Sequence, residues 1–243
     1  TDLTLEFSQS GQGQAAELVL AAVAAGADPR AIGSVNALAL IEAGPSVETG
    51  FYGNGVYDHA LCLLALAAVG EDVPEDAIAV LESSRTPEGG WAFDGIPAEG
   101  AADSNTTSLV VQALVALGQV DSSLVTDAMA YLLTSIDGES GAAFQPGAGF
   151  PADSSSTAMV LQAVIATDDD PTSETWGNLP AALATYQNAS GAFYFSPDDQ
   201  SDSVFATVQS IPALAGMAFP VMPGEESATP VTMNLDRPAL LAA

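Results

Sequence analysis

The chain repeats a pattern of about fifty residues, and this repeat limits the folds open to it. A glycine followed by an aromatic residue occurs within 89–93, 140–144 and 190–194, and each such turn leads through a polar loop to an apolar segment. Gln112 and Gln162 stand at matching positions in two of these segments. A repeat of this length predicts supersecondary units that stack on their own copies to bury a common core.

The apolar segments end at regularly spaced residues. A glycine just past a helix takes the left-handed conformation that ends the helix, so these positions predict the exits of five apolar helices. The spacing between successive exits is 44 to 50 residues. The exits are Gly26, Gly70, Gly118, Asp168 and Gly216.

An amphipathic segment follows each of the first four apolar ones. A helix that is apolar all round must be buried, whereas an amphipathic helix can cover it from outside. The pattern predicts an all-α fold, an α/α toroid of five repeats of about 44–50 residues, which could fall short of a closed ring of six hairpins. The toroid is expected over 1–217 and a proline-containing tail or linker over 218–243. Outer helices are expected over 31–43, 75–84, 122–135 and 176–187.

The turn residues resemble the repeat of the terpene cyclase and protein prenyltransferase superfamily, also known from squalene cyclases, over about 10–217. Its hallmark is an outer helix ending in Gln, followed by Gly-x-Trp or Gly-x-Phe. Because the superfamily includes cyclases, prenyltransferase subunits, cobalamin carriers and thioester domains, the resemblance implies a fold and leaves the function open. The matching residues are Gln187, Gly191 and Phe193, and Arg85, Gly89 and Trp91 with arginine in place of glutamine.

None of the family's catalytic signatures is found. The acid-bearing Asp-x-Asp-Asp-Thr segment of the cyclases matches 103–107, where Asn105 and Thr106 replace the two acids, and 153–157 also lacks them. The zinc motif Asp-x-Cys fails because Ala60 precedes the single Cys62 by two residues. The thioester segment is absent, and without the β domain of a cobalamin carrier a corrinoid cofactor has no support.

The charge balance excludes some partners. With 31 acidic residues, 3 arginines and no lysine, the net charge of −28 repels nucleic acid and disfavours anionic membranes. No apolar run reaches the roughly 20 residues that span a bilayer. An apolar small molecule or another protein remains as partner. The lysine-free surface favours an extracellular or cell-surface location, with the cytoplasm of a salt-adapted organism as the alternative.

Three neighbouring residues invite a metal interpretation. His59 and Cys62 share a helix face, and zinc accepts both of these side chains as well as that of Asp58. The favoured alternative is structural: Asp58 caps the helix, His59 lies in its first turn, and Cys62 packs in the core. We therefore expect no metal and no other cofactor.

Carboxylates recur at the starts of apolar helices. Asp103 and Asp153 could bind Ca²⁺ or grip a substrate, but repetition favours N-capping, because every repeat must begin its helix. The acidic run 168–170 before Pro171 is typical of a solvated turn, with Ca²⁺ as the minor option.

Aromatic residues gather at the turns, in 91–93, at Phe144 and in 193–195. They either stack on a ligand or, as we favour, fill the seams between hairpins. Gln112 and Gln162 either line the central cavity or bond to neighbouring repeats, and the sequence leaves these alternatives even. The candidate ligand-binding residues are Tyr57, Asp58, His59, Trp91, Phe93, Asp103, Gln112, Phe144, Asp153 and Gln162.

The sequence therefore favours a non-catalytic binding or scaffold module built on an α/α toroid. One alternative is an enzyme of the terpene cyclase or prenyltransferase type with an unidentified acid. The other is a structural subunit of a larger assembly.

Overall fold

The computed structural model describes residues 3–224 of the chain. Within this range the regular elements are helices, joined by turns with a few isolated β-bridges. None of these helices combines the length and apolar character needed to cross a bilayer. The helices are α1 (Leu3–Gln9), α2 (Gln12–Ala24), α3 (Leu38–Glu42), α4 (Val56–Val69), α5 (Glu75–Ser84), α6 (Ser104–Ala116), α7 (Ser123–Leu133), α8 (Ser154–Ala166), a 3-10 turn η1 (Glu174–Trp176), α9 (Leu179–Ala184) and α10 (Val204–Leu214).

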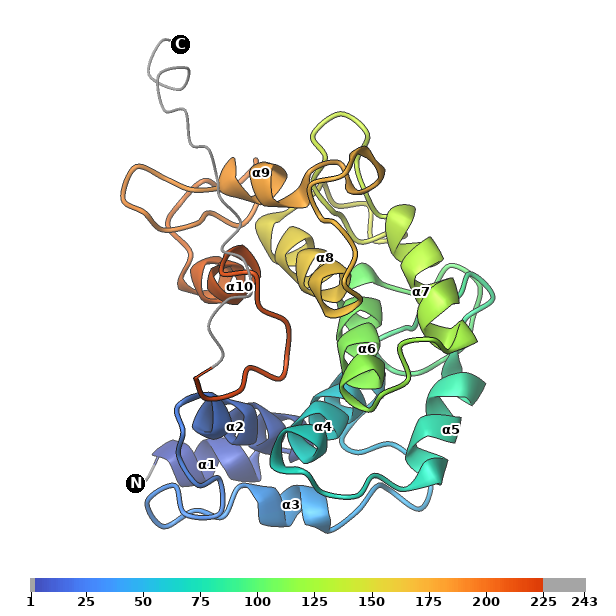
Figure 1. Ribbon diagram of the computed structural model, residues 1–243, viewed down its shortest axis with the longest axis vertical. Coiled ribbons are helices and arrows are strands. Elements are labelled where there is room, and N and C mark those ends of the chain that lie inside the picture. The colour runs from blue at the N-terminus through green and yellow to red at the C-terminus, as the bar shows by residue number, and fades with distance from the viewer. Residues whose placement is uncertain (1–2, 225–243) are drawn as a thin grey trace.

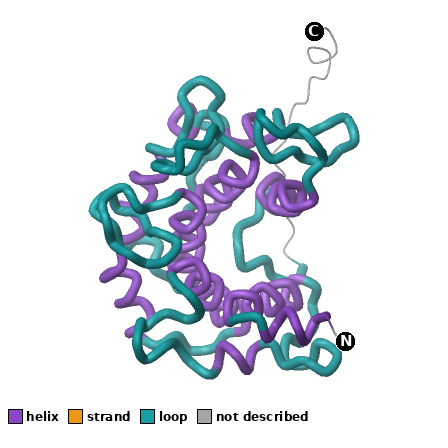
Figure 2. Tube along the Cα trace, turned by 180° about the vertical axis from the view of Figure 1, so that it is seen from behind, coloured by secondary structure: helices purple, strands orange, loops and turns teal. Residues whose placement is uncertain are grey.

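The helices form two concentric layers (Figure 1). Helices α2, α4, α6, α8 and α10 make the inner layer, and each packs against the next one along the chain. The outer layer of α3, α5, α7 and α9 surrounds them, and α1 packs on α2. Seen from behind, the inner helices curve around a common centre (Figure 2). The chain is an all-α protein of the α/α-toroid type, as the repeat predicts.

Burial separates the two layers. Most residues of α4 are buried, from Val56 at its start to Ala68 near its end, because this helix packs against α2 and α6 and its outer side faces the outer layer. Helix α5 buries only Ala77, Leu81 and Ser84 and presents its acidic residues to solvent. The expected contrast between inner and outer helices is confirmed for this hairpin.

The predicted helix exits all have left-handed backbone. Their φ angles are 68° at Gly26, 71° at Gly70, 73° at Gly118, 61° at Asp168 and 71° at Gly216. Four of these are glycines, which adopt such angles without steric cost, and Asp168 is the exception.

A threonine one turn into each of three inner helices fastens the preceding turn. The backbone N–H of Trp91 donates to Thr107 Oγ1 at 3.0 Å. The same bond recurs fifty residues later from Ala143 to Thr157 at 3.0 Å, and again from Phe193 to Thr207 at 2.8 Å. The repeat seen in the sequence is thus a repeated connection between turn and inner helix.

Two outer helices are shorter than predicted. The helix expected over 31–43 is present only as α3, because Gly33 has a φ of 62° and Ile32 pairs with Val35 in a tight bridge. The helix expected over 176–187 breaks into η1 and α9, since Gly177 and Asn178 both have left-handed backbone. Helix α1 was not predicted at all.

The inner layer departs from the prediction at α10. Val204, Phe205, Val208 and Ile211 are exposed, although an apolar inner helix was expected to be buried. The ring opens between α10 and α2, and residues 215–224 run across this opening (Figures 1 and 2). Pro223 lies beside Gly26, just past the end of α2. Of the predicted tail 218–243, residues 225–243 lie outside the described part.

Candidate functional site: the central cavity

The inner helices and the segment after α10 line a cavity of about 530 Å³ that is open to solvent on the side of α10. All five inner helices contribute to its lining, and so do residues of the segment 215–221. Most of the lining is apolar. Its larger apolar side chains are Leu20, Leu61, Leu109, Met159, Phe205, Val208, Ile211, Met217, Phe219 and Val221.

Helical spacing explains which residues face the cavity. Leu109 on α6, Met159 on α8 and Gln209 on α10 occupy one register, fifty residues apart. On α4, Tyr57 and Leu61 are four residues apart and therefore lie on one face of the helix. Side chains at equivalent positions of successive repeats thus line the same cavity.

Two glutamines of the inner helices hold the segment that crosses the ring. The backbone N–H of Phe219 donates to Gln112 Oε1 at 2.8 Å. Gln162 Nε2 donates to the carbonyl oxygen of Met217 at 3.4 Å. Gln162 also lines the cavity. It therefore combines the two roles that the sequence left open, because it faces the cavity and also forms a hydrogen bond to another segment. The bonds run to the segment 215–224 and not between inner helices.

Glu17 is the only carboxylate that lines the cavity among the described residues. It keeps access to solvent, while packing around it withdraws part of its hydration. Partial burial raises the pKa of the Glu17 carboxyl, and the negative charge of Asp58 adds to the rise. Burial, together with the charges of Glu17, Asp103 and Asp58, raises the pKa of Tyr57 to about 12. The electrostatic potential is therefore negative at the part of the cavity wall that Glu17 and Tyr57 form.

Asp103 and Asp153 are helix caps. Asp103 accepts a hydrogen bond from the N–H of Thr106 at 2.7 Å, and Asp153 accepts one from the N–H of Ser156 at 2.8 Å. The Ser156 hydroxyl also donates to Asp153 at 2.7 Å. Burial raises the pKa of both carboxyls, although these hydrogen bonds oppose the rise. Neither residue belongs to the cavity lining.

His59 is fully buried and both ring nitrogens have partners. Its Nδ1 accepts from the N–H of Tyr52 at 3.1 Å, so its Nε2 carries the proton and donates to the Ala77 carbonyl at 2.8 Å. Burial lowers the pKa of this histidine to about 4, which keeps it neutral. The imidazole of His59 thus links the turn before α4 to the outer helix α5.

The neighbours of His59 have separate partners. Asp58 lies in the first turn of α4 and accepts hydrogen bonds from Asn54, at 3.0 Å from its backbone N–H and 3.2 Å from its amide. The residue at the N-cap of α4 itself is Gly55. Cys62 is buried and its thiol donates to the Gln12 carbonyl. No group of three or more His, Cys, Asp or Glu residues in the described part is arranged to hold a metal ion.

The aromatic turn residues divide into two kinds. Trp91 is fully buried, and its indole N–H donates to the Leu81 carbonyl at 2.7 Å, so it fills the seam between α5 and α6. Phe193 is also buried. Phe93 is more than half exposed and stacks on Tyr57, with ring centroids 5.6 Å apart. Of the turn aromatics, including Phe144, none is part of the cavity lining.

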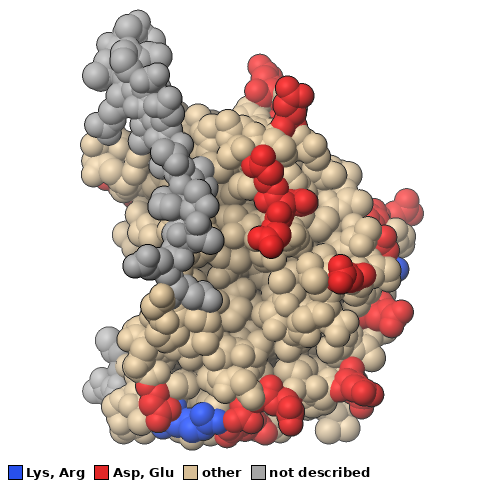
Figure 3. Space-filling model, viewed as in Figure 1, with Lys and Arg blue, Asp and Glu red and all other residues tan. Residues whose placement is uncertain are grey.

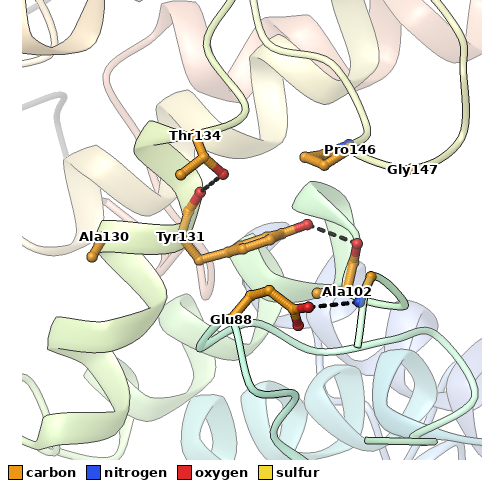
Figure 4. Close-up of a pocket in the computed structure, with 8 residues that line it drawn as sticks. Glu88, Ala102, Ala130, Tyr131, Thr134, Pro146 and Gly147 are labelled. Atoms are coloured by element: carbon orange, nitrogen blue, oxygen red, sulfur yellow. Dashed lines mark hydrogen bonds between the residues drawn. The ribbon is translucent and has the colours of Figure 1, made fainter. Parts of the chain in front are cut away.

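A second, smaller pocket of about 320 Å³ lies between α7 and the loops on either side of α6 (Figure 4). It is lined by Ala130, Tyr131 and Thr134 of α7 and its C-cap, and by loop residues such as Glu88, Ala102 and Pro146. The Tyr131 hydroxyl donates to the Ala102 carbonyl at 2.7 Å, and Glu88 accepts from the N–H of Gly100 at 2.6 Å. Tyr186 makes the equivalent bond to Ala152 in the next repeat. Because these polar groups already have partners and the bond repeats, this pocket is part of the repeat architecture.

The basic residues that the structure describes lie on the outer surface. Arg30 pairs with Glu71 at 2.6 Å and with Glu42 at 3.4 Å, and Arg85 pairs with Asp127. Arg237 lies outside the described residues. Acidic side chains dominate the charged groups on the face shown in Figure 3, which is hollowed near its middle. At the acidic run 168–170, Asp170 accepts from the N–H and hydroxyl of Thr172, which makes a local turn.

The structure brings together only part of the predicted ligand-binding set. Tyr57 and Gln162 line the cavity, Gln112 binds the segment that bounds it, and the other seven residues lie in caps and seams or on the surface. Glu17 and Gln209 line the cavity and were not proposed. The available signal was a polar residue inside an otherwise apolar helix, which marks Glu17 within 15–25 as clearly as it marks Gln162.

A search with protein-family models and a search of curated proteins found no match. A search of solved structures found, among its matches, a type II terpene cyclase, MstE from Scytonema, in a variant form in complex with its substrate geranylgeranyl dihydroxybenzoate. The likeness covers 84% of this chain and 73% of the cyclase, with 13% identity and a TM-score of 0.42. The toroid assignment follows from the helix packing described above.

Proposed function

We propose that the chain is a non-catalytic binding module whose central cavity takes an apolar small molecule. The observation that carries this proposal is the cavity of about 530 Å³ with apolar walls from all five inner helices. Small-molecule sites usually measure about 300–1,000 Å³ and are lined mainly by apolar side chains with a few polar groups. The exposed apolar residues of α10 at the opening of the ring offer an apolar approach to the cavity.

The carboxylates at the helix starts support binding over catalysis. Asp103 and Asp153 are engaged as helix caps, and Asn105 occupies a position where the cyclase motif has an acid. Protonation of an alkene needs a strong acid held against the substrate in a dry cavity. We therefore propose that a bound molecule leaves the cavity chemically unchanged.

We also propose an extracellular or cell-surface location. The support is a surface without lysine, on which Arg30 and Arg85 are both paired with acids. Such a surface has a strongly negative charge that favours solubility and repels nucleic acid.

Native mass spectrometry of the chain isolated from its source tests the proposed function. We expect a mass increase by one small molecule per chain, and solvent extraction should recover an apolar compound. A chain that carries no small molecule and takes up none from an added mixture of apolar compounds would refute the proposal. A stable mass corresponding to a complex with a second protein would instead favour the scaffold role.

A second candidate is an acid-dependent cyclase, and one observation favours it: the Glu17 carboxyl, whose pKa is raised, faces an apolar cavity. Incubation with squalene and with prenyl diphosphates, with and without Mg²⁺, separates the two candidates. The binding proposal expects unchanged substrates on gas chromatography. Products that disappear in the Glu17→Gln variant would establish the enzyme instead.

A further inference from the structure

Four side chains with polar groups in the described part of the chain line the central cavity, and only Glu17 among them carries a charge: Glu17, Tyr57, Gln162 and Gln209. Glu17 contributes to the lining from α2 and Gln209 from α10, the two inner helices that flank the opening of the ring. Gln209 Oε1 is buried and accepts no hydrogen bond from any described residue. Because this oxygen has almost no accessible surface, the charged acceptor that the cavity offers to a ligand is the Glu17 carboxylate.

The charges around this part of the cavity have one sign. Asp58 lies close enough to Glu17 to disfavour its ionisation, and Asp103 adds to the negative charge acting on Tyr57. Among the described residues that line the cavity there is no arginine, lysine or histidine. The site is therefore unsuited to a carboxylate or phosphate head group, because either would face Glu17 without a compensating cation.

The aromatic side chains of the lining fit the same polarity. The rings of Tyr57 and Phe205 contribute to the wall beside Glu17 and Gln209. A cation close to the face of an aromatic ring is attracted by the ring's electron density. Cations thus find favourable groups of two kinds in this cavity, a carboxylate and aromatic faces.

We propose that the ligand of the central cavity is an amphiphile with an apolar body and a primary ammonium head group, which pairs with the carboxylate of Glu17. This inference rests on the proposed function and names its ligand class. The apolar body lies against Leu61, Leu109 and Met159. The ammonium group donates charge-assisted hydrogen bonds to the Glu17 carboxylate, and its charge balances that of Glu17.

The test compares three probes with the same alkyl chain: decylamine, decanol and decanoate. Their affinities for the full chain are measured by isothermal titration calorimetry at neutral pH. We expect decylamine to bind about tenfold or more tightly than decanol, as one charge-assisted hydrogen bond provides, and decanoate to bind more weakly than decanol. The amine preference should fall to within about threefold in Glu17→Gln, which keeps the shape of the side chain.

A matched variant separates the cavity from the general negative charge of the protein. Glu75→Gln removes one carboxylate from the exposed first turn of α5, and the amine preference should persist. Equal binding of decylamine and decanol to the native chain, or an amine preference that survives in Glu17→Gln, would overturn the ammonium assignment while leaving the binding module intact. Failure of all three probes to bind would overturn the proposed function itself.

Discussion

The amide oxygen of Gln112 accepts a hydrogen bond from the backbone N–H of Phe219 at 2.8 Å, although 107 residues separate them along the chain. This bond fixes the segment after α10 against the middle of the inner layer. The segment bounds the central cavity, so the cavity depends on a contact between distant parts of the sequence.

Gln112→Met should lower the free energy of unfolding by about 1–3 kcal/mol, because it leaves the N–H of Phe219 without its acceptor. Gln162→Met is the matched control, since its bond to Met217 is longer at 3.4 Å and its loss should cost less. Urea titration gives both values, and hydrogen exchange should show faster exchange at Phe219 in Gln112→Met. Equal effects of the two variants would mean that the segment is held by apolar packing alone.

Trp91→Ala should destabilise the protein by about 3–5 kcal/mol, the range for truncation of a buried large aromatic residue. Phe93→Ala should cost only about 1 kcal/mol, because Phe93 is exposed and loses chiefly its stacking on Tyr57. Thermal or urea unfolding measures both variants. An unchanged melting temperature in Trp91→Ala would show that this residue is not a seam residue.

Because His59 is buried in its neutral form, we expect the folded protein to lose stability in mild acid. Burial holds the pKa of the folded-state imidazole at about 4, below its ordinary value of 6.5, so the unfolded chain binds the proton first. The stabilising contribution is complete above pH 6.5 and is lost as the pH falls towards 4, by about 3 kcal/mol in total. Urea titrations across this range should show the slope, and His59→Gln should flatten it. A slope unaffected by the substitution would contradict the buried neutral histidine.

Asp168 stands at a helix exit where the other four repeats have glycine, with a φ of 61°. Asp168→Gly should therefore stabilise the protein by up to about 1 kcal/mol. The reciprocal variant Gly118→Asp, at the equivalent exit after α6, should destabilise by a similar amount. Differential scanning calorimetry compares the two, and shifts of the same sign would exclude backbone strain as the cause.

Helical periodicity and regular glycine exits were enough to predict the toroid. Every repeat needs an apolar helix, a left-handed exit and an anchored turn, so the same signals recur and can be recognised. The outer helices were less predictable, because a single pair such as Gly177 and Asn178 breaks a helix that its apolar pattern still favours. The exposure of α10 also escaped prediction, since it depends on the opening of the ring beside it.

The cavity could be predicted only in part. Of the candidate ligand-binding residues, Tyr57 and Gln162 line the cavity, and Gln162 is recognisable in the sequence as a polar residue within an apolar helix. Glu17 has the same signature but is not among the candidate residues. Asp103 and Asp153 are helix caps, the role that their repetition favours. The bond between Gln112 and Phe219 joins a helix to a segment without periodicity, so no local pattern could have indicated it.

The binding of decanol to the central cavity tests the main proposal most directly. Burial of its alkyl chain should give one site per chain and a negative heat capacity change on calorimetry at several temperatures. Leu109→Trp should abolish binding because the indole fills the cavity. Val208→Trp should have the same effect, and because Val208 is exposed, its larger side chain should leave the stability of the fold unchanged. Ile96→Trp, an exposed position outside the cavity, is the control and should bind normally. The account predicts this pattern, and decanol binding that survives both cavity substitutions would contradict it.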